Sequence, residues 1–418
     1  MSAQSFRFLC AGGFQLHAVL QGLSAAPEHL LESLVSTPYR AAEQVFQAAI
    51  REEVDFVVLT GDLLDAASGG PRAVAFLVKQ FELLRDHGIG VYWAASKLDL
   101  STDWLQHVDL PANVHVFSDE LVEQKTVIVN ERPAVSVLGR SWSSQRPLRI
   151  AEYTSSAGDG KDVAVLYGAC DMEALPSRIE FVAMGGASEP NTTITGKQVI
   201  HSPGWSQGFL PSHQGAHGCT LVHVDQAGDI RTRRIETDAV RWVNERLSVP
   251  QGISLHDIRS ALRTRMQKLL ADAGRAILVD WTLAGEGWFD SVLVHQQRRD
   301  ELIQWLRDEF GKGSEPGWTL SMDIEPPETL RDEWTDEDSI LGDFLRVTRE
   351  YLQDETKPLV LETSAAVKHL PAELLAALPL SSGTLRASVL RQAALLGVNL
   401  LRGDERATES LAAMGRDD

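Results

Sequence analysis

The hydrophobic pattern of the first 110 residues alternates between short apolar runs and longer stretches in which apolar residues recur every three or four positions. The runs at residues 6–10, 56–59 and 89–93 predict buried strands. The stretches between them predict helices, of which one begins at Thr37 and the other at Pro71. Strand, helix, strand, helix and strand in this order predict a parallel sheet that is covered on both faces.

From about residue 113 to residue 236 the pattern changes to short strands joined by turns rich in Gly, Ser and Asp. A separate α+β pattern follows. Its predicted elements are, in order, a helix at 255–273, a strand at 276–282, a helix at 299–310 and a strand at 318–324. The remaining residues are helical in character. We therefore expect a main α/β domain at 1–245, a small α+β capping domain at 246–330 and a helical region at 331–418.

The composition indicates a folded globular protein, because hydrophobic residues make up 44% of the 418 positions. The 39 basic and 58 acidic residues give a formal net charge of −19. A negative field of this size repels phosphate backbones, so strong autonomous DNA binding is disfavoured. Arg231, Arg233 and Arg234 alternate along a predicted strand and could touch phosphate, although a solvated strand face is the alternative.

The three cysteines, Cys10, Cys170 and Cys219, are widely spaced and form no CxxC motif, which argues against a disulfide framework or a zinc ribbon. No charged N-terminal segment precedes an apolar stretch, and no apolar run approaches the ~18 residues needed to span a bilayer. We therefore expect a reduced, cytoplasmic protein that is neither secreted nor inserted in a membrane.

Ligands of parallel α/β sheets bind in the loops beyond the carboxyl ends of the strands, which here are the loops after residues 10, 59 and 93. The segments FRFLCAGGFQLH, VDFVVLTGDLLD and ASKLD run through these loops. In order and spacing they resemble the FRFLHAADxHLD, VDFVLxAGDLFD and GNHD motifs of the calcineurin-like metallophosphoesterase superfamily, specifically its SbcD-like DNA repair exonuclease branch.

Later segments extend the resemblance over the whole chain. PGWSQG at 203–208 and HGCTLVHVD at 217–225 are similar to the family's PGxxQG motif and the strand after it, and VDWTLAGEG at 279–287 resembles the YhaO-type members. The resemblance implies a four-layer α/β metallophosphoesterase sandwich, in which helices flank two packed β-sheets, followed by a small capping domain and a helical tail.

Members of this family hold two manganese ions with carboxylates, an asparagine and imidazoles, and the ions activate a water and neutralise the charge that develops on phosphorus. At the matching positions of this chain, Gly13 and Gln15 replace the Asp and His of the first motif. Asp62 keeps the carboxylate of the second motif. Lys97 and Leu98 replace the Asn and His of the third.

The other ligand positions are also changed. Asp99 ends the third motif, but Tyr167 stands where the family has an isolated His. Gly186 and Ser188 stand where a GHxH element should supply two imidazoles. One carboxylate beside a lysine cannot hold two divalent cations, so we expect no metal cofactor and no catalytic residue.

Lys97 has two interpretations. Its charge could replace an ion and pair with Asp62, so that the two loops are held together, or it could be an ordinary solvated lysine at a loop edge. A replacement metal site is a weaker alternative, because the candidate imidazoles match no ligand spacing and follow different predicted strands. These imidazoles belong to His17, His201, His213 and His217.

Five of the ten tryptophans lie in the C-terminal part of the chain, where they could stack on single-stranded bases, although core packing is the commoner role of tryptophan. They are Trp281, Trp288, Trp305, Trp318 and Trp334.

The tail carries an apolar stripe at helical spacing. The stripe consists of Leu385, Val389, Ala393, Leu396 and Leu400. In SbcD-like proteins the C-terminal helices grip a coiled-coil ATPase, so the resemblance implies a partner-binding role for this stripe. The alternative is that the helix packs back on its own capping domain.

The function implied by the resemblance is that of a catalytically inactive subunit that serves as a scaffold or regulator for an SbcC-like coiled-coil ATPase. The protein would contact DNA only as part of such a complex. It could also form a homodimer. A metal-dependent DNA exonuclease or phosphoesterase with a rebuilt site is the enzymatic alternative. A third reading is a protein that binds an unrelated ligand in the vacated cleft.

Overall fold

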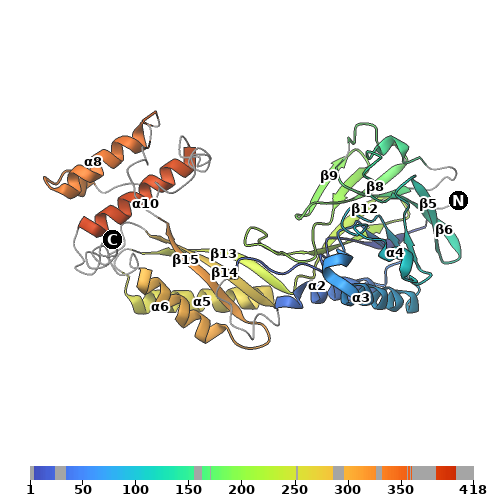
Figure 1. Ribbon diagram of the computed structural model, residues 1–418, viewed down its shortest axis with the longest axis horizontal. Helices are drawn as coiled ribbons and strands as arrows, with labels where there is room; N and C mark the ends of the chain where they lie inside the picture. Colours follow the sequence, from blue (N-terminus) through green and yellow to red (C-terminus); the bar gives the residue numbers. More distant parts are fainter. Residues whose placement is uncertain are drawn as a thin grey trace. The chain divides into compact units, whose positions relative to one another are not determined.

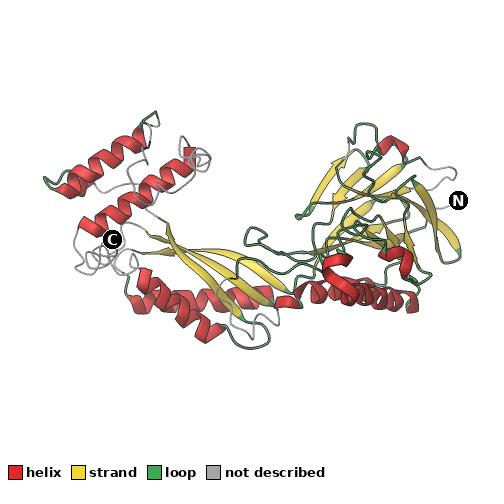
Figure 2. Cartoon of the chain, in the orientation of Figure 1, coloured by secondary structure: helices red, strands yellow, loops and turns green. Residues whose placement is uncertain are grey.

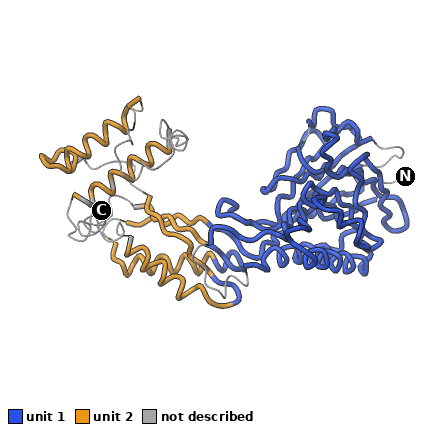
Figure 3. The backbone as a smooth tube through the Cα atoms, in the orientation of Figure 1, with its two compact units in different colours: residues 1–243, 270–278, 314–316 blue, residues 244–269, 279–313, 317–418 orange. Residues whose placement is uncertain are grey.

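The computed structural model describes most of the chain. The described residues are 4–23, 34–154, 162–169, 171–250, 253–285, 296–325, 332–354, 356–357, 359 and 383–401. The chain divides into two compact units (Figure 3). Unit 1 contains residues 1–243, 270–278 and 314–316, and unit 2 contains residues 244–269, 279–313 and 317–418.

Unit 1 begins with a six-stranded sheet, here called sheet A (Figures 1 and 2). Its strands are, in spatial order, β12 (Ile230–Glu236), β11 (Gly218–Val224), β1 (Phe6–Ala11), β2 (Phe56–Leu59), β3 (Gly90–Trp93) and β4 (Val114–Val116). The strands β1 to β4 are parallel, whereas β11 and β12 add an antiparallel edge. The parallel part agrees with the pattern of the first 110 residues.

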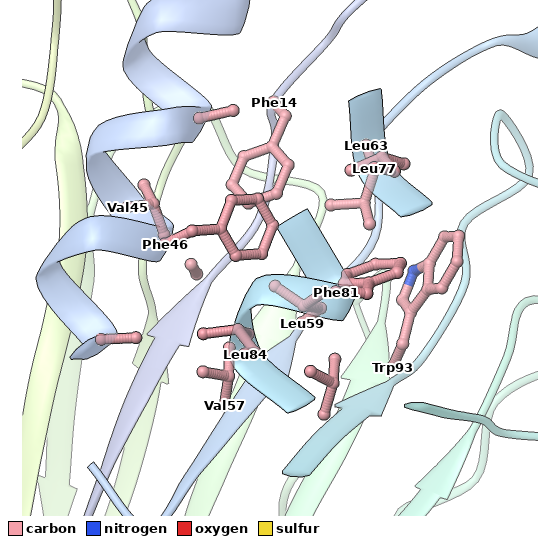
Figure 4. Close-up of a cluster of buried hydrophobic side chains, with 14 of the residues drawn as sticks. Phe14, Val45, Phe46, Val57, Leu59, Leu63, Leu77, Phe81, Leu84 and Trp93 are labelled. Atoms are coloured by element: carbon pink, nitrogen blue, oxygen red, sulfur yellow. The ribbon is translucent and has the colours of Figure 1, made fainter. Parts of the chain in front are cut away.

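Helices α2 (Thr37–Arg51) and α3 (Ala66–Asp86) cover one face of sheet A. The aromatic rings of Phe14, Phe46 and Phe81 pack in a chain at this interface, with centroids 5.4 and 5.9 Å apart (Figure 4). Burial of such large rings contributes roughly 2 to 3 kcal/mol each, which fixes the helices on the sheet and the loops at its carboxyl edge.

A second six-stranded sheet, sheet B, packs on the other face of sheet A. Its strands are, in spatial order, β5 (Glu123–Val129), β6 (Arg132–Arg140), β7 (Asp162–Tyr167), β8 (Ile179–Gly185), β10 (Gln198–Ser202) and β9 (Asn191–Thr195). Phe8 of sheet A stacks on Phe56 at 4.8 Å and meets Phe181 of sheet B edge-on at 5.2 Å. The outer face of sheet B is covered partly by the 3₁₀ helix η1 (Ile150–Glu152). The expected α/β sandwich of two packed sheets is confirmed.

Unit 2 contains most of a three-stranded sheet and several helices. The strands are β13 (Val240–Val249), β14 (Ala276–Gly285) and β15 (Gly317–Glu325), and the helices are α5 (Leu255–Ala273), α6 (Gln296–Phe310), α7 (Asp332–Thr335), α8 (Ile340–Gln353) and α10 (Gly383–Leu401). α5, β14, α6 and β15 match the expected helices and strands, and α7, α8 and α10 agree with the expected helical region, whereas β13 was not expected. Unit 1 also contains the short helix α4 (Trp104–His107).

The C-terminal tryptophans serve mainly the core. Trp281, Trp318 and Trp334 are buried, and the indole Nε1 of Trp281 donates to Thr319 Oγ1 at 3.2 Å. The guanidinium carbons of Arg259 and Arg263, both on α5, lie 5.6 and 5.2 Å from the ring centroid of Trp305. Trp288 lies outside the described residues. Among the helices that the structure describes, none is long and apolar enough to cross a bilayer.

Candidate functional site

The loops after β1 and β2 meet at the carboxyl edge of sheet A and are joined by backbone hydrogen bonds. The amide of Gly13 donates to the carbonyl of Gly61 at 2.9 Å, and the amide of Gln15 donates to the carbonyl of Asp62 at 3.0 Å. Gly13, Gln15 and Asp62 all have positive φ, at 59°, 48° and 57°. The family positions of the first two motifs therefore form one rigid, tightly turned surface.

Asp62 is the carboxylate that remains at this edge, and only 7% of the residue is exposed. Its Oδ2 accepts a hydrogen bond from the Tyr167 hydroxyl at 3.1 Å. Burial raises the pKa of Asp62, while hydrogen bonds from Ser96 and Tyr167 act in the opposite direction. Tyr167 thus occupies, with a neutral phenol, the place where the family has an imidazole.

Lys97 does not pair with Asp62. Its side chain is exposed, and the ammonium lies 5.8 Å from the ring centroid of Trp142. Within the described part of the chain, the ion pair expected between Lys97 and Asp62 is not formed, so that expectation is wrong. An exposed ammonium that stacks on an indole stays hydrated, whereas contact with a buried carboxylate would require both charges to lose water.

Gly13 has no room for the carboxylate that the family places there. A Cβ atom built on Gly13 would collide with the indole of Trp205 and would lie 2.7 Å from its Cγ. The indole therefore fills the space beside the turn. Trp205 comes from the PGWSQG segment, and the sequence offered no sign of this contact beyond the bulk of the residue.

The β8 end of the site is closed by backbone contacts. A Cβ on Gly185 would collide with the carbonyl of Thr60, and Gly186 has a φ of 98°. The carbonyl of Ser188 accepts from the amide of Trp205 at 2.9 Å. Leu98 is partly exposed and its amide donates to Ser96 Oγ at 3.1 Å. None of these positions offers a metal ligand.

The residues at this edge do not fit the two divalent ions that the family would use. The Asp62 carboxylate accepts a hydrogen bond from a phenol, and the Asp99 carboxylate accepts from three backbone amides. At the remaining family positions stand a glycine beside an indole and an exposed lysine. In the described ranges, no group of three or more His, Cys, Asp or Glu side chains could hold a metal ion.

The four histidines of the replacement-site alternative have separate roles. The amide of Asp65 donates to His17 Nδ1 at 3.2 Å. His201 lies between the hydroxyls of Thr192 and Thr220, at 2.8 and 2.9 Å. The rings of His213 and His217 are 6.2 Å apart. Of these histidines, only His213 and His217 contact each other, and the four build no shared site with three or more metal-ligand side chains.

Asp99 is a buried carboxylate that organises the site loops. It accepts from the amides of Leu63 at 2.7 Å, Leu64 at 3.1 Å and Ser96 at 2.8 Å. Burial raises its pKa to about 6, although these three hydrogen bonds favour the charged form. Asp99 thus joins the loops after β2 and β3 and contributes structure rather than metal binding.

Stability is expected to depend on pH through Asp99 and His201 in opposite directions. The Asp99 pKa rises from 3.8 to about 6, so its contribution is present below pH 3.8 and is lost as the pH rises through 6. Burial lowers the pKa of His201 from 6.5 to about 4, so its contribution is present above pH 6.5 and is lost as the pH falls through 4.

Each effect amounts to about 3 kcal/mol, and the two largely cancel between pH 4 and 6. We therefore expect His201→Gln to make the free energy of unfolding fall as the pH rises through this window. Asp99→Asn should make it rise instead. Urea unfolding at several pH values measures both slopes, and parallel profiles for the two variants would contradict the assignment.

One curated protein is similar to most of this chain. No family model matches this chain. The uncharacterized metallophosphoesterase YhaO of Bacillus subtilis (strain 168) is 25% identical over 334 residues, which cover 76% of this chain and 81% of the relative. The chain is thus similar to a metallophosphoesterase over most of its length. This relative confirms the resemblance of the loop motifs to metallophosphoesterases.

Solved structures are also similar to part of this chain. A dimetal phosphatase from Danio rerio is 9% identical, with a TM-score of 0.33, and the match covers 53% of this chain and 93% of that chain. A putative 5'-nucleotidase from Staphylococcus aureus, in complex with alpha-ketoglutarate, is 12% identical, with a TM-score of 0.33, over 64% of this chain and 59% of that chain.

Proposed function

We propose that this metallophosphoesterase-like chain is a catalytically inactive subunit that acts as a scaffold or regulator in an SbcD-like DNA-repair complex. The observation that carries the proposal is the closed edge of sheet A. There, Trp205 fills the space at Gly13, and Tyr167 hydrogen-bonds the remaining carboxylate of Asp62. Side chains that could activate water through two ions are replaced by aromatic side chains and a lysine.

The proposed partner is an SbcC-like coiled-coil ATPase, which would bind the apolar stripe of α10. The side chains of Leu385, Val389 and Leu396 are 47%, 37% and 60% exposed, and Ala393 is also exposed. The side chain of Leu400 lies outside the described residues. An exposed stripe of this kind favours a helix-on-helix contact with a partner.

The opposite face of α10 accounts for its packing within the chain. Leu390, Ala394 and Val398 are buried, and Ala394 and Val398 belong to one core cluster with Leu341 and Leu345 of α8. The alternative role of the helix, packing on its own domain, is thus met by a different face from the predicted stripe. Burial of one face and exposure of the other are compatible with a helix that serves both contacts.

Helix α8 adds apolar surface beside the stripe. Ile340 and Val347 are 76% and 52% exposed. The two helices run antiparallel, because Phe344 lies against Gly397 and the Arg386 guanidinium donates to the Tyr351 carbonyl at 3.3 Å. These two contacts fix how α8 and α10 are aligned. With this alignment, helical spacing puts the exposed side chains of both helices on the same side of the helix pair. A partner helix could therefore lie between them.

DNA contact is proposed only within the complex, and a cytoplasmic location is proposed for it. The net charge of −19 disfavours independent binding to a phosphate backbone. Of the three arginines of β12, Arg233 pairs with Glu52 at 2.6 Å, and Arg234 donates to the carbonyl of Pro203. Arg231 forms no ion pair with the residues that the structure describes, so this strand offers little free positive charge beyond one side chain.

Metal analysis tests the inactive assignment. We expect the purified chain to carry no stoichiometric manganese or zinc, because a single carboxylate does not offset the dehydration of a divalent ion. Elemental analysis after equilibration with manganese measures this, and hydrolysis of a phosphodiester with and without EDTA is the parallel assay. About two ions per chain together with EDTA-sensitive hydrolysis would support the exonuclease alternative and overturn the proposal.

A further inference from the structure

One edge strand of unit 1 lacks the features that usually prevent edge-to-edge pairing. Such features are charged side chains, bulges and extreme shortness. Among the four edges of sheets A and B, β12 carries three arginines, β4 has three residues, and β5 carries Glu123, Lys125 and a bulge after Val127. Strand β9 has the sequence NTTIT, with no charge and no recorded bulge.

Strand β9 is also open to solvent along its whole length. All five of its residues are exposed, and Ile194 is 69% exposed. An uncharged, exposed edge that is rich in β-branched residues is a template for a further strand. Its outward backbone groups can be identified from the hairpin that it forms with β10.

The hairpin between β9 and β10 has a two-residue loop, Gly196 and Lys197, and Thr195 pairs with Gln198. Gly196 has a φ of 63°, which suits the first central position of a type II′ turn. In such a hairpin, hydrogen-bonded and non-hydrogen-bonded pairs alternate away from the loop. The amides and carbonyls of Thr192 and Ile194 therefore point away from β10, to the open edge.

We propose that β9 pairs with β9 of a second copy of this chain, in an antiparallel register centred on Thr193. This register places Thr192 opposite Ile194 of the second copy, so the outward amides and carbonyls form about four backbone hydrogen bonds. It also places Glu189 opposite Lys197 of the second copy, once at each end. Both residues are exposed, so the two oppositely charged pairs close the ends of the interface.

The charge pattern favours a second copy over an unrelated strand, because the same segment supplies both partners of each ion pair. Two chains of net charge −19 repel one another, yet this edge has no net charge from residue 189 to 197. The contact is short, so we expect a dimer that dissociates on dilution. The two sheets B would then form one continuous twelve-stranded sheet, a count that doubles the six strands of each copy.

Sedimentation velocity of the full chain over a concentration series tests this interface. We expect a monomer–dimer equilibrium whose association constant falls roughly tenfold in Lys197→Glu, because two attractive pairs become repulsive. The double variant Glu189→Lys, Lys197→Glu should restore association to within about twofold, since the charges are exchanged and the register is kept.

Ile194→Pro is the second variant. It removes an amide that points outward, so it should abolish the dimer and leave the hairpin with β10 intact, as judged by circular dichroism and the unfolding midpoint. A chain that is monomeric at every concentration would overturn the proposal. A dimer that persists in Ile194→Pro, or that the charge exchange fails to restore, would place the contact elsewhere and would also overturn it.

Discussion

Gly13→Asp, the change that restores the family carboxylate, is expected to destabilise the chain by about 2 to 5 kcal/mol and to restore no metal binding. Two effects add. At a φ of 59° an aspartate is strained relative to glycine, although less than most residues, and its Cβ would collide with the indole of Trp205. Chemical denaturation measures the loss, and manganese titration of the folded fraction measures binding.

The matched control combines the change with removal of the indole. Trp205→Ala should recover part of the stability lost in Gly13→Asp, because the collision disappears and only the backbone strain remains. If the free-energy losses of the two single variants simply add in the double variant, the two residues do not compete for the same space. Manganese binding by the single variant Gly13→Asp would show that the remaining side chains suffice as metal ligands, which would contradict this prediction.

Leu396→Asp and Leu390→Asp are expected to separate partner binding from folding in α10. Leu396 is 60% exposed, whereas Leu390 is 8% exposed. A carboxylate at Leu396 should weaken binding of the coiled-coil ATPase by at least about 30-fold with the helix pair intact. Leu390 is buried, so a carboxylate there would lose its hydration and should destabilise the helix pair.

Binding of the purified variants to the coiled-coil ATPase of the same genome, followed by surface plasmon resonance, measures the first effect. Near-ultraviolet circular dichroism and limited proteolysis measure the second. If Leu396→Asp binds the ATPase as tightly as the unchanged chain, the stripe is not the contact. If it unfolds the helix pair, the solvent-facing assignment of Leu396 is wrong.

The local hydrophobic periodicity predicted much of the fold, because the pattern that identifies a strand or a helix is contained within a short segment of the sequence. The helix from Leu255 to Ala273 and the strand from Phe56 to Leu59 coincide with their predicted positions. The absence of ligand side chains at Gly13, Lys97 and Tyr167 could likewise be read directly from the motifs. These are statements about single positions and their neighbours.

Contacts between distant residues could not be predicted in this way. Trp205 lies 192 positions after Gly13, and only the folded chain brings its indole beside the first loop. Lys97 was expected at Asp62 because their strands are neighbours, but the two side chains leave their loops in different directions. Strand order limits where a loop lies, whereas side-chain direction depends on the conformation of each loop.

The positive φ of Asp62 gives a reason for its presence that does not involve ions. Asp and Asn tolerate the left-handed region better than other residues with a side chain, because their short polar groups bond locally, and glycine adopts it freely. The turn after β2 therefore favours Asp, Asn or Gly at position 62 whether or not a cation is bound there. An aspartate that once served as a metal ligand can therefore be retained for its backbone conformation after metal binding has been lost.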